Sequence, residues 1–369
     1  MSGVRRWLLA LAALPTGLAA QSPNAATASG GDGKLYVGTY AKQILVLDER
    51  TFAITDTIPV SIGIPIAMLL SSNRKHFYVM DPTFENVEVI DIASKKAIDK
   101  FTLSSGRTKV RIRGLNVEPN EKFAVFLIKT ATRQSDRWEI GKPTLVRYDL
   151  EKHAVTDTIP WPKGEEREGA QMLFSPNGDL LYFFADEVLI FETKGLKQVD
   201  RWELGRALEE GLGRFNFGFP ETVYEEPGFY TGMFRVSDPV QNRTLMGVAR
   251  VDLVRRSVDF YTLGPNESVG FALAPGRRRA YGLKQQVGNW EIWTYDLENR
   301  RVLSKTPFRG RPRMGLDVSS NGSLLYIHTA GMTVDLYDTA SGRFLRSIEL
   351  PADMTDFFVL PAPAQTPAR

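Results

Sequence analysis

Short runs of apolar residues alternate with polar turns along most of the chain. The runs are four to eight residues long and rich in Val, Ile, Leu, Tyr and Phe, which is typical of half-buried or buried strands. Residues 203–212 are the one stretch for which we expect a short helix. The pattern therefore predicts an all-β fold.

Seven of these runs end in an acidic residue that is followed by a polar turn. Four of the six separations between these residues lie between 42 and 44 residues, and the other two are 58 and 60. A constant period with two longer members indicates a repeat architecture in which the third and fifth units carry inserted loops. The seven residues are Asp48, Asp91, Asp149, Glu192, Asp252, Asp296 and Asp338.

A second landmark recurs in step with the first. Turn signals such as Pro-Asn-Gly precede an aromatic-rich strand in most repeats, because these residues supply the fixed and positive φ angles of a tight turn. With one strand before the turn and one after the acidic residue, each unit contains four short strands, which is a propeller blade. We expect the aromatic residue of this strand to pack between blades, at Tyr78, Phe126, Tyr182, Tyr281 and Tyr326.

The two ends of the repeat region complement each other. The first unit begins at residue 34 with its second strand, and residues 355–361 form a strand without a unit. We therefore predict a single domain over 34–361, a seven-bladed β-propeller of four-stranded blades, with the ring closed by the C-terminal strand and a disordered tail over 362–369. Six or eight blades remain open at this point, because the third and fifth units are the least regular.

Neither the acidic residues nor the histidines predict a metal site. An Asp at a strand end accepts hydrogen bonds from the backbone of the following turn. A carboxylate can be a metal ligand, but seven carboxylates spaced around a ring cannot converge on one ion. His76, His153 and His328 lie in three different repeats, so they form a metal site only if distant loops converge.

The N-terminus has the layout of a signal peptide. Arg5 and Arg6 precede the apolar run 7–14 and a small-residue region, so we expect a signal peptide over 1–20, with cleavage as late as residue 28, and a flexible leader over 21–33. A membrane anchor is the alternative, but the run is shorter than the roughly 20 residues of a span. The mature chain is then exported, periplasmic or secreted, with no membrane span.

Charge and cysteine content restrict the chemistry. The net charge of +3 includes Arg5 and Arg6, which leaves 44 basic against 43 acidic residues and gives no reason to expect a nucleic-acid partner. The absence of cysteine excludes disulfides, covalent c-type haem and thiol catalysis within this chain. The motifs of zinc hydrolases, nucleotide-binding loops and serine hydrolases are also missing. We therefore assign no catalytic, cofactor-binding or metal-binding residue.

The two inserted segments, 129–145 and 211–244, are the candidates for binding. Long loops on a rigid scaffold are where binding usually resides, and aromatic and arginine side chains anchor interfaces. The alternative for the second segment is that its aromatics belong to the core of the fifth unit. The partner-binding candidates are Arg133, Asp136, Arg137, Trp138, Phe215, Phe217, Phe219 and Tyr224.

The repeats resemble those of YVTN-type propellers, in the runs LYVGTY, FYVM and VEVID. The insertions are similar to those of the propeller (β) subunit of quinohaemoprotein amine dehydrogenase, through TRQSDRWEIGKPTLVRYD at 132–149, the extended fifth unit and the last repeat. The resemblance covers most of 34–360. It implies a non-catalytic periplasmic scaffold that holds no cofactor itself, with haem and a tryptophan-derived quinone in partner subunits.

Three functions follow as hypotheses. The first is the non-catalytic propeller subunit of an amine dehydrogenase-like complex. The second is a stand-alone binding propeller without a redox partner, whose ligand lies on one face or in the central channel. The third is a metal-free lactonase-like hydrolase, for which the sequence offers acidic and arginine residues but no motif that selects them.

Overall fold

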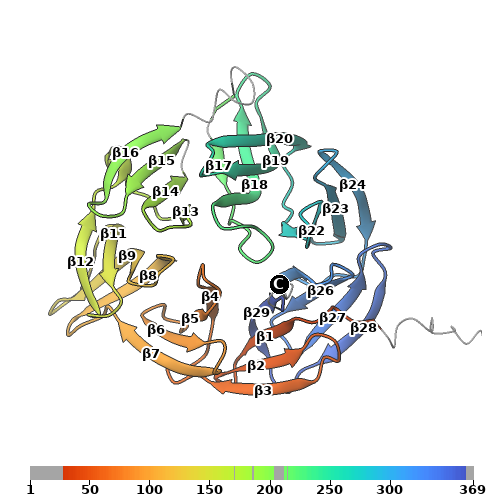
Figure 1. The fold of residues 1–369 in the computed structure, drawn as a ribbon, viewed down its shortest axis with the longest axis horizontal. Coiled ribbons are helices and arrows are strands. Elements are labelled where there is room, and N and C mark those ends of the chain that lie inside the picture. Colours follow the sequence, from red (N-terminus) through yellow and green to blue (C-terminus); the bar gives the residue numbers. More distant parts are fainter. Residues whose placement is uncertain (1–27, 170, 185–186, 203–211, 214, 363–369) are drawn as a thin grey trace, which may run out of the picture.

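The protein is a ring of seven antiparallel sheets around a central axis (Figure 1). The computed structural model describes residues 28–169, 171–184, 187–202, 212–213 and 215–362. The all-β, seven-bladed propeller predicted from the repeat period is confirmed. The predicted signal peptide, and all but the first residue of the C-terminal tail, lie outside the described residues, as does most of the expected helix at 203–212.

Each blade has four strands, ordered from the axis outward, and the bounds are as follows. Blade 1 contains β29 (Met354–Leu360), β1 (Lys34–Thr39), β2 (Gln43–Asp48) and β3 (Ile54–Pro59); blade 2 contains β4 (Ala67–Leu70), β5 (His76–Met80), β6 (Asn86–Asp91) and β7 (Lys96–Thr102). Blade 3 contains β8 (Thr108–Val117), β9 (Phe123–Arg133), β11 (Thr144–Asp149) and β12 (Ala154–Ile159), with β10 (Trp138–Ile140) added beside β9. Blade 4 contains β13 (Gln171–Phe174), β14 (Leu180–Phe184), β15 (Val188–Glu192) and β16 (Lys197–Trp202). Blade 5 contains β17 (Phe215–Phe217), β18 (Phe229–Asp238), β19 (Arg243–Asp252) and β20 (Ser257–Pro265). Blade 6 contains β21 (Ala272–Leu273), β22 (Arg279–Gln286), β23 (Asn289–Asp296) and β24 (Arg301–Pro307); blade 7 contains β25 (Met314–Val318), β26 (Leu324–Thr329), β27 (Thr333–Asp338) and β28 (Phe344–Glu349). Within the described residues, one 3₁₀ turn, Pro162–Gly164, follows β12.

The second strand of each blade is apolar on both of its sides. In β5 and β14, four of the five residues are buried, and in β9 the first six are buried. Such a strand needs an apolar layer on each face of its sheet, which only two flanking blades supply. The five aromatic residues predicted to pack between blades are all buried, and three of the tyrosines donate a hydrogen bond to the next blade: Tyr78 to Glu121, Tyr182 to the Leu253 carbonyl, and Tyr326 to Glu49.

The ring closes where the last strand of the chain pairs with the first. Strand β29 is antiparallel to β1, with Phe357 opposite Val37 and Val359 opposite Leu35. Beside this pair, the buried carboxylate of Glu49 in blade 1 accepts hydrogen bonds from the Ser320 amide of blade 7 (2.8 Å) and from the Gly33 amide (3.1 Å). Residues 29–33, expected to be flexible, are therefore held against blades 1 and 7 at this junction.

The acidic landmark residues cap the turns that follow them, as predicted. In six blades the aspartate accepts a backbone N–H two or three residues later, for example from Ser94 to Asp91 at 2.7 Å. Four residues after every landmark, the chain adopts a positive φ of 50–66°, and only blade 7 places glycine there. The positions are Phe52, Lys95, His153, Leu196, Arg256, Arg300 and Gly342.

The side chains at these positive-φ positions connect neighbouring blades at the outer rim. His153 of blade 3 pairs with Asp99 on the outer strand of blade 2 (2.9 Å), and Arg300 of blade 6 pairs with Asp259 of blade 5 (2.7 Å). Lys95 pairs with Asp56, and Arg256 pairs with Asp200, in the same arrangement. Phe52 packs under Arg346 of blade 7 instead. The turn that the aspartate caps therefore also aims a side chain at the preceding blade.

The connections lie on two opposite faces of the ring. One face carries the turns between first and second strands and between third and fourth strands, such as 71–75 and 92–95. We name it the cavity face, after a cavity that is described below. We name the insertion face after the β9–β11 insertion; it carries the turns between second and third strands and the links between blades, such as 81–85 and 103–107. Backbone hydrogen bonds tie the connections within each face, including Ile92 N to Lys75 O and Arg133 N to Arg107 O, both 2.9 Å.

Deletion of residues 354–369 is expected to abolish the cooperative fold. It removes β29, whose buried Met354, Phe357 and Val359 would each cost about 2–5 kcal/mol if truncated to alanine, against a total stability of about 5–15 kcal/mol. The measurement is a thermal melt followed by circular dichroism. Deletion of 363–369 alone, which leaves β29 in place, is the control, and an unchanged melt for the longer deletion contradicts closure by β29.

Asp356 is expected to make the fold less stable as the pH rises. Its carboxylate lies on β29 and accepts hydrogen bonds from the Met68 amide of blade 2 (2.7 Å) and from the Phe357 amide (2.9 Å), while burial raises the pKa of Asp356 to about 6. Because the folded state holds this proton more tightly, the free energy of unfolding should fall by up to about 3 kcal/mol between pH 4 and pH 6. Asp356→Asn should remove this part of the pH dependence in urea titrations. Asp353→Asn, at an exposed carboxylate of the preceding loop, is the control, and an identical slope for both variants contradicts the assignment.

Candidate functional site

The blade 3 insertion brings four of the predicted residues together. Strand β9 runs past the end of its blade and pairs with β10, so that Trp138 lies opposite Arg133. Asp136 and Arg137 form the tip, with an ion pair of 3.2 Å and side chains about two-thirds exposed. Trp138 is 51% exposed and Ile140 is 60% exposed. The insertion is thus a hairpin extension with aromatic, aliphatic and charged side chains open to solvent.

The second segment divides into a core part and a surface part. Phe215 and Phe217 on β17 are buried among Tyr230, Phe234 and Phe260, so these two candidates belong to the core between blades 4 and 5. A partner cannot reach them. The alternative interpretation of the sequence, that these aromatics fill the core of the fifth unit, is what the structure shows for them.

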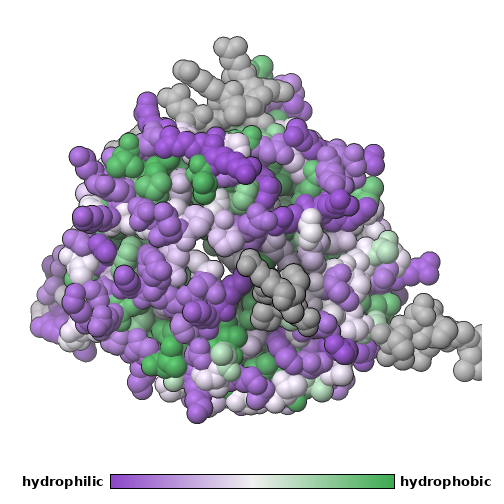
Figure 2. Space-filling view, in the orientation of Figure 1, coloured by the Kyte–Doolittle hydropathy of each residue, from purple (hydrophilic) through white to green (hydrophobic). Residues whose placement is uncertain are grey.

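Exposed apolar side chains gather at the turn tips of the insertion face. Five of the six turns between second and third strands that the structure describes completely carry one or two, and the sixth has the half-buried Phe84. Among the described connections of the cavity face, two large apolar residues are exposed: Val254, and the candidate Phe219, which is 85% exposed between β17 and β18. Figure 2 shows one side of the molecule, where hydrophilic residues cover most of the surface between separate apolar patches. The exposed residues of the insertion face are Tyr40, Trp138, Ile140, Val240, Val287 and Met332.

A loop from blade 5 reaches the centre of the ring on the cavity face. Residues 218–228 connect β17 to β18, and the ribbon projects toward the axis (Figure 1). The Tyr224 hydroxyl donates to the Val318 carbonyl of blade 7 (2.7 Å), and Glu221 accepts from the Leu273 amide of blade 6 (3.2 Å). From the opposite side, Arg74 of blade 2 donates to the Val223 carbonyl (2.7 Å). We name residues 218–228 the axial loop, since it is tied to three other blades.

An ion pair between the buried Glu225 carboxylate and the half-exposed Arg250 anchors the outer end of the axial loop. The Arg250 guanidinium on β19 donates two hydrogen bonds of 3.0 Å to the Glu225 carboxylate. It also stacks over the Phe229 ring, 3.9 Å from the ring centroid. The Thr231 hydroxyl donates to the same carboxylate. Burial alone would raise the pKa of Glu225, but the hydrogen bonds from Arg250 and Thr231 outweigh it and hold the pKa below its usual value.

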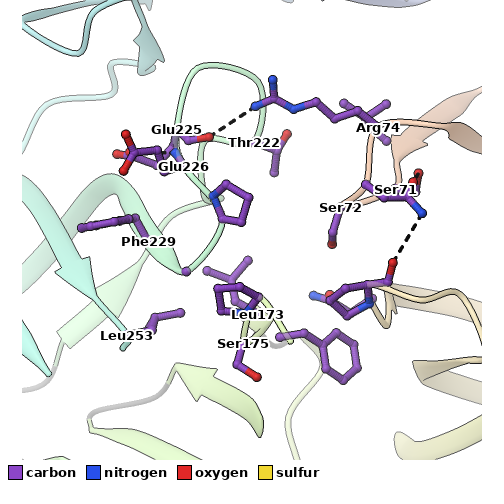
Figure 3. Close-up of a pocket in the computed structure, with 18 of the residues that line it drawn as sticks. Ser71, Ser72, Arg74, Leu173, Ser175, Thr222, Glu225, Glu226, Phe229 and Leu253 are labelled. Carbon is purple, nitrogen blue, oxygen red and sulfur yellow. Dashed lines mark hydrogen bonds between the residues drawn. The ribbon is translucent and has the colours of Figure 1, made fainter. Parts of the chain in front are cut away.

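The axial loop forms one wall of a cavity of about 410 Å³ (Figure 3). The opposite walls are the turns after β4, β8 and β13, which belong to blades 2, 3 and 4. Leu173, Leu253 and Phe229 give it apolar surface, and Ser72, Thr222 and Arg74 give it polar groups. Its volume is in the range of small-molecule sites.

Several carboxyl groups lie around the inner end of the axial loop. Burial raises the pKa of Glu221 and of Glu49, and the negative charge of Asp317 adds to the effect at Glu221. Burial, with the charges of Glu49, Asp317 and Glu221, also raises the pKa of the Tyr224 hydroxyl. Burial and like charge thus both favour the neutral forms of these groups, so ionisation at higher pH opposes packing of the loop against the ring.

The structure places the three histidines apart, each beside a different carboxylate. His76 contacts Glu121 (2.7 Å), His153 contacts Asp99 (2.9 Å), and His328 contacts Asp317 (2.9 Å). Within the described ranges, no group of three or more His, Asp or Glu side chains is arranged to hold a metal ion. No helix in the same ranges is long and apolar enough to cross a bilayer.

Comparison with known proteins supports the fold. No protein-family model matches the sequence, and no curated protein matches it either. A functionally unknown protein from Desulfotomaculum acetoxidans superimposes with a TM-score of 0.54 at 14% identity over 90% of this chain and 100% of that one. A eukaryotic initiation factor gives 0.51 at 12% identity over 90% and 99%. A Kuenenia stuttgartiensis hydrazine synthase chain gives 0.49 at 12% over 92% and 100%. At these identities the first two likenesses describe architecture and leave activity open.

Two features of the site were not predicted from the sequence. The axial loop was part of a candidate segment, but its reach across the ring depends on partners such as Arg74 and Val318, which are distant in the sequence. The apolar turn tips could have been found, because Val240 and Val287 interrupt turns otherwise made of Gly, Asn, Gln and Pro.

Arg250→Met is expected to destabilise the protein by about 3–5 kcal/mol, because it leaves the buried Glu225 carboxylate without its bidentate partner. The measurement is urea unfolding at pH 7. Arg255→Met in the same blade is the control, since the Arg255 side chain is 85% exposed and its ion pair with Asp252 is long, at 3.9 Å. Equal effects of the two substitutions would show that the anchor is not needed.

Proposed function

We propose that this protein is a non-catalytic propeller scaffold that binds a partner protein through its insertion face. The observation that carries the proposal is the asymmetry of the exposed apolar side chains. Six lie in the connections of the insertion face, and two, Phe219 and Val254, lie in the described connections of the opposite face. Single exposed apolar residues are ordinary on a protein surface, but a set on one face is typical of an interaction site.

The chemistry of these tips suits a protein partner. Turn tips favour Gly, Asn, Asp and Ser for conformational reasons, so Val240, Val287 and Met332 gain nothing locally from their exposure. Trp138 adds a large anchor on the hairpin of blade 3, and tryptophan is among the residues that contribute most to protein interfaces. The tips project from five blades of one ring, which presents them together on one face.

The charges on this face indicate which charge the rim of the partner's binding surface carries. Among the described residues, Arg107, Arg133, Arg309 and Arg313 lie in its connections without a carboxylate within ion-pair distance. Glu85, Glu166 and Glu267 on the same face already pair with Lys109, Lys142 and Lys284. Fewer exposed carboxylates are unpaired in the described connections of this face, at Glu139 and Asp353, so the unpaired charge is mostly positive. The complementary partner then has acidic residues around an apolar centre.

The finer form of the proposal is a scaffold subunit of an amine dehydrogenase-like complex in the periplasm, with haem and a tryptophan-derived quinone in partner subunits. It rests on the resemblance of the extended third and fifth blades. The blade 3 extension lies on the proposed docking face, as a partner-facing insertion would. A stand-alone binding propeller is the second candidate, and the cavity beside the axial loop favours it.

Capture of the partner should depend on the blade 3 hairpin. In purification of the tagged protein from its native host, the double variant Trp138→Ser, Ile140→Ser should lose the partner while its melting temperature stays within about 2 °C, because both side chains are exposed. Mass spectrometry and a visible absorption spectrum identify what co-purifies, and haem bands support the finer form of the proposal.

The matched control is Val155→Ser on β12, the outer strand of the same blade, where the side chain is 48% exposed. This variant should retain the partner. The proposal fails if wild-type protein comes out alone, or if the hairpin variant retains the partner as well as the control does.

A further inference from the structure

The cavity beside the axial loop holds a positive charge that no carboxylate compensates. We propose that this cavity binds a small organic carboxylate with an apolar body, whose carboxylate group is held by Arg74. The site lies on the cavity face, opposite the proposed docking face, so the inference does not depend on the proposed function.

The cavity is shaped by parts of the fold that are held in place. The Ser71 and Ser175 hydroxyls accept the His76 and Leu180 amides, at 3.0 and 2.9 Å, and so fix the turns after β4 and β13. The axial loop is fixed by the Glu225–Arg250 pair. A site formed by such segments needs little reorganisation to bind a ligand, which favours affinity.

Arg74 differs from the other arginines near the axial loop. Its guanidinium donates to two neutral acceptors, the Val223 carbonyl at 2.7 Å and the Glu225 carbonyl at 3.3 Å. Within the part of the chain that the structure describes, no carboxylate lies within ion-pair distance of it. Arg250 and Arg277, by contrast, are engaged by the Glu225 and Glu226 side chains. Arg74 is thus the cation that remains available to a ligand.

The acidic side chains of the lining do not cancel this preference for an anion. Glu225 is neutralised by Arg250, and Glu226 pairs with Arg277 at 2.7 Å. Glu221 accepts the Val223, Tyr224 and Leu273 amides, and burial raises its pKa. Each of these groups already has its donors, whereas the arginine fork still has N–H groups to offer to a carboxylate.

The remaining lining selects the body of the ligand. The Ser72 and Thr222 hydroxyls flank the opening on the same side as Arg74, and both can donate to a carboxylate (Figure 3). The half-buried Leu70, Leu173 and Phe229 give the cavity apolar surface. An anionic head beside an apolar wall matches an aromatic or branched aliphatic carboxylate, and gives little to a sugar or a cationic amine.

Benzoate and benzamide test the assignment, because they share shape and differ in charge. Isothermal titration calorimetry of the full-length protein at fixed ionic strength should show saturable benzoate binding, at least tenfold tighter than benzamide. Arg74→Gln should weaken benzoate at least tenfold, and Arg74→Lys, which keeps the charge, should lose less than that.

Arg278→Gln is the matched control, since Arg278 is exposed in a turn of the same face and does not line the cavity. It should leave benzoate binding unchanged. Thermal melts of all variants separate loss of binding from loss of fold. The proposal is overturned if benzoate does not bind saturably, if benzamide binds equally well, or if folded Arg74→Gln binds benzoate as the wild type does.

Discussion

A sheet that is apolar on both faces needs a neighbour on each side, and in this protein that requirement can be met only by a closed ring. The second strands of the blades are buried nearly throughout, so a blade at an open end would expose one of its layers to water. Closure depends on the pairing of β29 with β1 and on the carboxylate of Glu49, which joins blade 1 to blade 7. The rest of the structure, including both candidate sites, relies on this junction.

The same requirement explains the regularity of the sequence. The aspartate at the end of the third strand caps a turn, and the turn places a positive-φ residue four positions later. That residue then contacts the outer strand of the preceding blade, as in the pairs His153–Asp99 and Arg300–Asp259. The acidic residue therefore caps a local turn whose positive-φ residue contacts the preceding blade. Counting its seven copies in the sequence predicts the number of blades. Because turns are formed within a few residues, this part of the fold could be predicted from the sequence.

The candidate sites could be predicted less well, because they depend on contacts between distant residues. Trp138 and Arg133 were identified by composition, and the hairpin that exposes them follows from their adjacency in the chain. Phe215 and Phe217 were identified in the same way, from an aromatic-rich segment. The neighbouring blade decides whether such an aromatic side chain faces the core or the solvent. Arg74 gave no signal at all, since its role depends on a loop about 150 residues later. The scaffold could thus be predicted because it depends on local contacts. The candidate sites could be predicted less well because they depend on long-range contacts.

The central claim is that the partner lies on the insertion face, and chemical cross-linking tests it most directly. Lys42 and Lys142 are exposed on that face, whereas Lys75, Lys122 and Lys152 lie in turns of the cavity face. Lysine-specific cross-linking in native cells, followed by mass spectrometry, should join partner peptides to Lys42 and Lys142. Cross-links to a partner confined to Lys75, Lys122 and Lys152 would contradict the account.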